Sequence, residues 1–125
     1  MFKKKRSLSK KENEHSVIRR RIHYYAGILA EHIATLYLRC KFYRIIARRY
    51  RCHFGELDII AIKGGQILFI EVKKRASHHT ESISQRSAKR IYNAASYFLA
   101  KNAKFKNFDV RIDLIQLNRF FIPKH

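Results

Sequence analysis

The most regular hydrophobic pattern in the chain lies between residues 57 and 72. Two runs rich in β-branched residues, 57–62 and 66–72, are separated by the short segment Lys63-Gly64-Gly65. Runs of this length and composition are typical of buried strands, and adjacent glycines favour the tight turns that join antiparallel strands. The pattern therefore predicts a β-hairpin.

Helices are predicted on both sides of this hairpin. Segment 17–41 contains no proline and is apolar nearly all round in its second half, which indicates a substantially buried helix. A second helix is predicted over 82–101, where Ser82-Ile83-Ser84-Gln85 fits a capping box. Segments 42–54 and 108–117 read as further strands. The predicted order is α-β-β-β-α-β, that of a small α/β domain.

The net charge of the chain indicates the class of its binding partner. The chain carries 28 Lys+Arg against 9 Asp+Glu, a formal net charge of +19. Such a charge favours a polyanionic partner: DNA, RNA, the ribosome surface or, less strongly, an anionic membrane. A general drift of composition toward Lys and Arg is the alternative explanation. We expect a flexible basic arm over residues 1–16, one domain over 17–118 and a short tail over 119–125.

Composition also excludes some classes of protein. No run of 18 apolar residues occurs, so no membrane span is expected, and the basic N-terminus lacks the hydrophobic region of a signal peptide. Cys40 and Cys52 are the only cysteines, and they show no zinc-site spacing with the 7 His. We therefore expect reduced thiols in a cytoplasmic protein.

The hairpin holds three of the 9 acidic residues, Glu56, Asp58 and Glu71. Strand alternation places Glu56 and Asp58 on one face, and Glu71 and Lys73 on one face of the next strand. Pairing through the turn brings Asp58 near the strand end that carries Glu71, which predicts a carboxylate pair beside a lysine. Carboxylates suit Mg²⁺, and a lysine can stabilise developing charge, so the arrangement suits phosphodiester hydrolysis. A solvated face or a cross-strand ion pair is the alternative.

These residues resemble a known pattern. Asp58 followed by Glu71-Val72-Lys73 resembles the PD-(D/E)XK nuclease superfamily. More closely, GELDIIA at 55–61 and FIEVKKR at 69–75 resemble the small bacterial YraN-like family, whose relatives are thought to be the Holliday-junction resolvases. The resemblance spans about 24–117. It implies a single restriction-endonuclease-like domain, with a mixed central sheet flanked by helices.

The resemblance also implies roles for individual residues. Asp58 and Glu71 would bind Mg²⁺ or Mn²⁺, and Lys73 would position the attacking water or stabilise charge. Glu31, on the first helix, would bind a metal-coordinated water or a second metal, and Glu56 would support the site. An ion pair with a nearby arginine is the alternative for Glu31, because a carboxylate among small and apolar residues needs a partner.

Basic residues near these acids are candidates for phosphate contacts. The resemblance also implies a supporting Gln or Lys near the start of the second helix. The family's usual Lys falls near Ser87, so Gln85 is the candidate substitute, with helix capping as its alternative role. The family usually has Gly-Tyr at 42–43 and Asn-Trp at 49–50, and this chain departs at Phe42, Arg49 and Tyr50. Arg111 and Asp113 are predicted to form a structural ion pair. The candidate nucleic-acid-binding residues are Arg48, Arg49, Arg51, Lys74, Arg75, Gln85, Arg86 and Lys89.

The sequence therefore predicts a Mg²⁺-dependent endonuclease that acts on DNA, with branched or structured DNA as a candidate substrate. The alternative is a non-catalytic protein that keeps a nuclease fold and binds nucleic acid or the ribosome. Binding to a membrane surface through the basic arm is a weaker third hypothesis. A homodimer is expected from the resemblance to junction resolvases alone.

Overall fold

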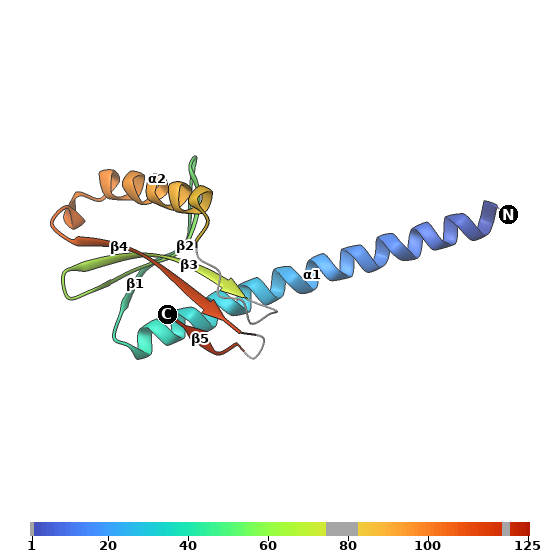
Figure 1. The fold of residues 1–125 in the computed structure, drawn as a ribbon, viewed down its shortest axis with the longest axis horizontal. Helices are drawn as coiled ribbons and strands as arrows, with labels where there is room; N and C mark the ends of the chain where they lie inside the picture. Colours follow the sequence, from blue (N-terminus) through green and yellow to red (C-terminus); the bar gives the residue numbers. More distant parts are fainter. Residues whose placement is uncertain (1, 75–82, 119–120) are drawn as a thin grey trace.

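The structure, a computed structural model, describes residues 2–74, 83–118 and 121–125. The predicted order of elements is confirmed, with one short strand added at the end (Figure 1). The elements are α1 (Phe2–Cys40), β1 (Arg44–Cys52), β2 (Gly55–Lys63), β3 (Gln66–Lys74), α2 (Gln85–Lys101), the 3-10 helix η1 (Ala103–Phe105), β4 (Asp109–Leu117) and β5 (Pro123–Lys124).

The five strands form one mixed sheet in the order β1-β2-β3-β4-β5. The hairpin is confirmed: β2 and β3 pair antiparallel, and Gly64 and Gly65 both have positive φ, 54° and 79°, as a tight two-residue turn requires. β4 pairs with β3 in parallel, so the chain must cross over between them. α2 provides this crossover.

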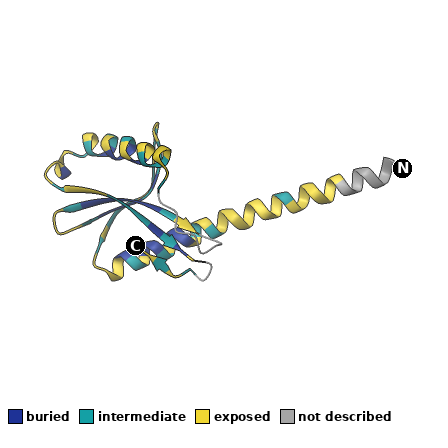
Figure 2. Cartoon of the chain, in the orientation of Figure 1, coloured by how far each residue is buried: buried dark blue, intermediate teal, exposed yellow. Residues whose placement is uncertain are grey.

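Each face of the sheet carries one helix and one apolar core (Figure 1). The core under α1 joins its buried residues Ala30, Ala34 and Leu38 to alternate residues of the sheet, among them Ile59 and Ile70. The core under α2 contains Leu57, Ile60, Ile67, Phe69, Ile91, Ala94, Ala95, Phe98 and Phe105. Buried positions lie in the strands and along one side of each helix, whereas the described residues in the projecting half of α1 are almost all exposed (Figure 2).

The largest differences from the predicted boundaries lie at the starts of the two helices and at the end of the chain. α1 begins at Phe2 rather than near residue 17, and its first half projects away from the sheet (Figure 1). Lys, Arg and Glu are good helix formers, and neither Gly nor Pro interrupts residues 2–26, so the expected arm continues the helix.

At the start of α2 and at the end of the chain, hydrogen bonds set where the elements begin and end. α2 begins at Gln85, because the Ser84 side chain accepts the N–H of Ser87 and acts as the N-cap. The expected cap Ser82 lies outside the described residues. The predicted tail contains β5, which pairs antiparallel with the end of β4.

Strand alternation changes phase near the start of β2. Ile59 packs in the core under α1, yet Leu57, two residues earlier, packs in the core under α2. Arg49 lies on β1 between Arg48 and Tyr50, the partners of these two residues, and has φ 50°, a left-handed conformation unusual for arginine. This irregularity sets the orientation of Asp58.

Within the described residues, no helix is both long and apolar enough to cross a membrane. Cys40 and Cys52 carry free thiols.

Candidate metal centre at the fork of the hairpin

The candidate site lies where β2 and β3 stop pairing. Their register ends at Ile59 opposite Ile70, whereas β3 continues to pair with β4 as far as Lys74. The hairpin therefore opens as a fork just before Asp58. The Asp58 carboxylate accepts a hydrogen bond from the backbone N–H of Val72, at 2.7 Å. A side chain thus replaces the strand partner, and it fixes the Asp58 carboxylate at the fork.

Three carboxylates converge here from two elements. Glu31 comes from α1, and Glu56 and Asp58 come from β2; one ligand oxygen from each lies within 4.8 Å of the others. We call these residues the three-acid group. Glu31 is only 8% exposed, and Ala30 and Ala34 beside it pack on the sheet. The packing of α1 on the sheet therefore places Glu31 at the fork. The sequence predicts this residue of the first helix to be part of the site.

Two arginines of β1 contact the three-acid group. Arg49 Nε donates to Glu31 Oε2 at 2.7 Å, and Arg51 Nε donates to Glu56 Oε2 at 2.7 Å. The hydrogen bond to Glu31, helped by one to Tyr24, holds the pKa of the Arg49 guanidinium above its usual value. The alternative predicted for Glu31, an ion pair with an arginine, is thus present in the structure.

The pKa of the Asp58 carboxyl is clearly shifted from its ordinary value. Burial raises the pKa of the Asp58 carboxyl to about 6, and the charges of Glu31, Glu71 and Glu56 add to the rise. The hydrogen bond from Val72 opposes this shift, because it favours the ionised form. A bound cation would relieve the cost of ionising Asp58 at this position.

Glu71 does not join the three-acid group. Its Oε1 lies 3.2 Å from Lys73 Nζ, and its Oε2 accepts from Arg90 of α2 at 3.0 Å. Its partner Arg90 comes from α2, whereas Glu31 comes from α1, but the charge of Glu71 still helps to raise the pKa of Asp58. The predicted neighbours Glu71 and Lys73 are therefore together, and Asp58 lies beside the strand end that carries Glu71, where it accepts from Val72. The carboxylates grouped within 4.8 Å of Asp58, however, are Glu31 and Glu56.

Arg90 was absent from the predicted site residues. It follows Arg86 by one helical turn and precedes the buried Ile91, so its position near the sheet could have been read from the sequence. A second contact fixes it: a Cβ added at Gly55 would lie 2.8 Å from Arg90 Cδ. A side chain at position 55 would therefore force Arg90 to move, and the φ of 133° at Gly55 also favours glycine there.

Comparison with known proteins agrees with the motifs. Residues 30–117 match the model of a family described as "Uncharacterised protein family UPF0102". The chain belongs to this family. The UPF0102 chain is 46% identical to a UPF0102 protein of Ehrlichia ruminantium over 88 residues, 70% of this chain and 69% of that one. It is 34% identical to a UPF0102 protein of Rhizobium etli over 116 residues, 91% of this chain and 94% of that one. The resemblance to the YraN-like family is thereby confirmed.

The family match covers every acid of the site. Residues 30–117 include Glu31, Glu56, Asp58, Glu71 and Lys73. Most of α1, from Phe2 to Leu29, precedes the matched region. The UPF0102 site therefore lies within the region that the family model matches.

Some of the predicted phosphate-contacting residues of the UPF0102 chain contact other side chains, and others are exposed to solvent. Arg49 and Arg51 contact the three-acid group, and Lys74 Nζ lies 4.2 Å from the centre of the Phe121 ring. Arg75 lies outside the described residues. The remaining candidates are exposed on β1 and the first turns of α2: Arg48, Gln85, Arg86 and Lys89.

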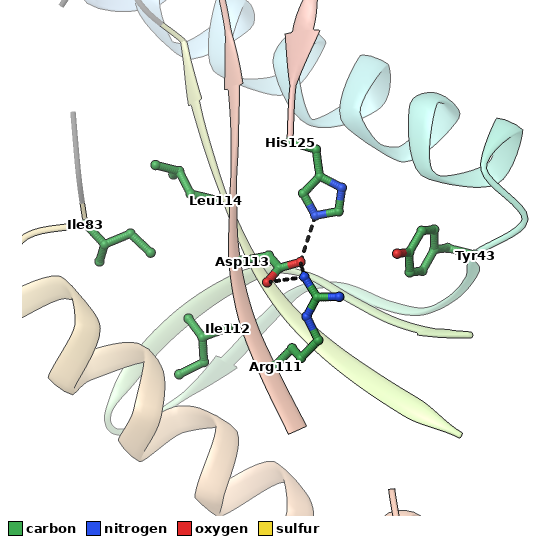
Figure 3. Close-up of a pocket in the computed structure, with 7 residues that line it drawn as sticks. All are labelled: Tyr43, Ile83, Arg111, Ile112, Asp113, Leu114 and His125. Atoms are coloured by element: carbon green, nitrogen blue, oxygen red, sulfur yellow. Dashed lines mark hydrogen bonds and ion pairs between the residues drawn. The ribbon is translucent and has the colours of Figure 1, made fainter. Parts of the chain in front are cut away.

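A separate pocket lies along β4 (Figure 3). Its volume is about 560 Å³, and the three-acid group is not part of its lining. Asp113 accepts from Arg111 at 3.0 Å and lies 2.8 Å from His125 Nε2. The predicted Arg111–Asp113 ion pair is confirmed, and His125, which follows β5, joins it.

Proposed function

We propose that this UPF0102 protein is a metal-dependent nuclease of the PD-(D/E)XK type that hydrolyses phosphodiester bonds in DNA. The observation that carries the proposal is the convergence of Glu31, Glu56 and Asp58 in a chain of net charge +19. A protein that only binds phosphates gains nothing from three clustered carboxylates, because they repel the nucleic acid backbone. A divalent cation between the acids and a phosphate removes that conflict.

The donor set fits a hard divalent cation. Mg²⁺ and Mn²⁺ favour carboxylate oxygens, and the three-acid group offers one oxygen from each residue within 4.8 Å. Arg49 and Arg51 contact Oε2 of their acids, and each carboxylate has a second oxygen. When bound, the metal would supply the positive charge that activates water and stabilises a phosphorane-like transition state.

Lys73 is assigned to electrostatic stabilisation in this proposal. It lies on β3 two residues past Glu71, and the 3.2 Å contact with Glu71 holds its ammonium group. Its side chain is about half exposed, so a phosphate can approach it. Glu71 then acts by orienting Lys73, and it could serve as a metal ligand only if Arg90 released it.

The substrate is proposed to be DNA because of the charge and the superfamily resemblance together. Exposed Arg48, Arg86 and Lys89 lie on the elements that flank the site and would contact phosphates on either side of the cleaved bond. Branched DNA is the proposed substrate class, following the resemblance to junction resolvases.

One observation favours a second candidate function. Arg49 and Arg51 each neutralise one acid of the three-acid group without a metal. A protein that had lost its metal chemistry could keep such pairs as structural contacts. This candidate is a nucleic-acid- or ribosome-binding protein that retains the nuclease fold.

A cleavage panel separates the two candidates. Wild type and Asp58→Ala would be incubated with labelled duplex, single-stranded and four-way-junction DNA and with RNA, with and without Mg²⁺ or Mn²⁺. The nuclease proposal expects metal-dependent cutting by wild type, fastest on junction DNA, and none by the variant. Tight binding by both proteins without any cutting would favour the binding function. Equal cutting by Lys73→Ala and wild type would remove Lys73 from the scheme.

A further inference from the structure

α1 carries an apolar stripe on the side that faces away from the sheet. Its members lie at spacings of four, three, four and seven residues, and each is 48–66% exposed. Position 32, which divides the last interval into three and four, holds an exposed histidine. The members of the stripe are Ile18 at 54%, Ile22 at 62%, Tyr25 at 66%, Leu29 at 48% and Leu36 at 62% exposure.

This stripe is distinct from the face of α1 that packs in the domain. The packed face is formed by Ala30, Ala34 and Leu38, all at most 2% exposed. At 3.6 residues per turn, these positions point to the opposite side of the helix from Leu29 and Leu36. A continuous row of large apolar side chains on the solvent side of a helix marks an interaction surface.

The spacing specifies what kind of partner fits. Alternating steps of four and three are the heptad repeat of a coiled coil, in which two helices interdigitate along one seam. The repeat extends from Ile18 to Leu36, about 27 Å along the helix axis. A helix with the same repeat is complementary to this one, and a second copy of the chain supplies it.

Charge and geometry agree with a parallel pair. In a parallel coiled coil, a residue at the g position faces the residue five places later on the partner. Glu14 occupies a g position, and Arg19 lies five residues later, so each copy offers one ion pair to the other. Because the domain packs on the far side of α1, the two domains would lie outside the seam.

We propose that α1 is a self-association surface, and that two copies of this chain pair in parallel through the apolar stripe. The dimer would place one three-acid group on each side of a two-fold axis. The proposal does not depend on the nuclease function, because the stripe belongs to α1 alone. With a short seam and a net charge of +19 per copy, we expect micromolar affinity that strengthens as salt rises. Nucleic-acid binding would respond to salt in the opposite direction.

Sedimentation velocity of the full chain tests this proposal. Wild type would be measured from 1 to 200 μM in 0.15 M and 1 M NaCl, the higher salt also removing bound nucleic acid. We expect dimerisation, at least about tenfold weaker in Ile22→Glu and in Leu29→Glu. His32→Leu would complete the repeat and tighten the dimer severalfold. Tyr92→Glu, which changes an exposed aromatic residue on α2, is the matched control and should dimerise like wild type.

Each contrary result has a definite meaning. The substituted positions are exposed, so circular dichroism and the melting temperature should show that every variant folds. A wild type that stays monomeric throughout would overturn the proposal, as would equal weakening by Tyr92→Glu. The stripe could instead bind lipid. A monomeric wild type that floats with phosphatidylserine vesicles, and an Ile22→Glu variant that does not, would assign it to a membrane surface.

Discussion

Asp58 accepts the backbone N–H of Val72 at 2.7 Å, at the position where β2 leaves β3. This contact links the fold to the chemistry. The fork needs an acceptor for an N–H that has lost its strand partner, and the same carboxylate faces Glu31 and Glu56. Asp58 is thereby held beside two other acids at a cost in stability, which gives the first prediction.

Replacing Asp58 by Asn should stabilise the protein above neutral pH. The pKa of Asp58 is about 6 in the folded chain, against 3.8 for an ordinary aspartate. The folded chain therefore binds more protons than the unfolded chain between these values, and the free energy of unfolding falls as pH rises through that window. At pH 8 the charge costs up to about 3 kcal/mol, which Asn would remove.

Urea unfolding at several pH values measures this effect. The difference between Asp58→Asn and wild type should grow between pH 4 and 7 and vanish near pH 3.5. Asp109→Asn, the same substitution at the exposed start of β4, is the control. A stability difference that does not depend on pH would show that Asp58 is not the strained carboxyl described here.

Arg49 should compete with a metal for Glu31. Its Nε lies 2.7 Å from Glu31 Oε2, and its φ of 50° is one that asparagine tolerates better. Arg49→Asn should therefore fold and should tighten Mn²⁺ binding by roughly fivefold, the equivalent of about 1 kcal/mol for a partly exposed ion pair. Titration calorimetry measures the affinity. Arg48→Asn removes the same charge from the neighbouring exposed position and should leave Mn²⁺ affinity nearly unchanged.

Gly55 should be the least replaceable glycine of the hairpin. It has φ 133°, and a Cβ there would meet Arg90 Cδ at 2.8 Å. Gly55→Ala should lower the free energy of unfolding by about 1–3 kcal/mol and displace Arg90 from Glu71. Gly64→Ala, at φ 54° with no atom within 4 Å of the added Cβ, should cost only about 1 kcal/mol. Equal costs in denaturant titrations would argue against the close approach of Arg90.

Binding to duplex DNA should depend steeply on salt. If six or more phosphates are neutralised, affinity should fall at least about a thousandfold between 50 and 200 mM NaCl. Lys89→Ala on α2 should reduce the slope of log K against log salt by about 0.9. Lys63→Ala removes the same charge from the hairpin turn, at the opposite end of β2 from Asp58, and should leave the slope unchanged. Fluorescence anisotropy measures both slopes, and a shared loss would indicate diffuse binding.

The sequence predicted the elements better than their boundaries. The hairpin and the α-β-β-β-α-β order follow from two adjacent glycines and from hydrophobic runs of strand length, which are local properties. The start of α1 was wrong because a basic, polar composition is compatible with both a flexible arm and a projecting helix. The cap of α2 was wrong because two serines, Ser82 and Ser84, offer similar side chains two residues apart.

The candidate site was predicted in composition but not in arrangement. Strict alternation placed Glu56 and Asp58 together correctly, and the small residues around Glu31 identified it as an acid that needs a partner. Alternation could not anticipate the change of phase at Arg49 and Asp58, because it depends on the left-handed backbone conformation of Arg49. Asp58 is thereby grouped with Glu31, while Glu71 contacts Arg90.

The most direct test of the central claim is the single-turnover rate of four-way-junction cleavage in Mg²⁺ and in Mn²⁺. Wild type, Asp58→Asn and the control Asp109→Asn would be compared at enzyme concentrations that saturate the DNA. We predict metal-dependent cutting by wild type and Asp109→Asn, and a rate at least about a hundredfold lower for Asp58→Asn. Cutting by Asp58→Asn as fast as wild type, or no metal-dependent cutting by wild type, would contradict the assignment of the three-acid group as a catalytic metal centre.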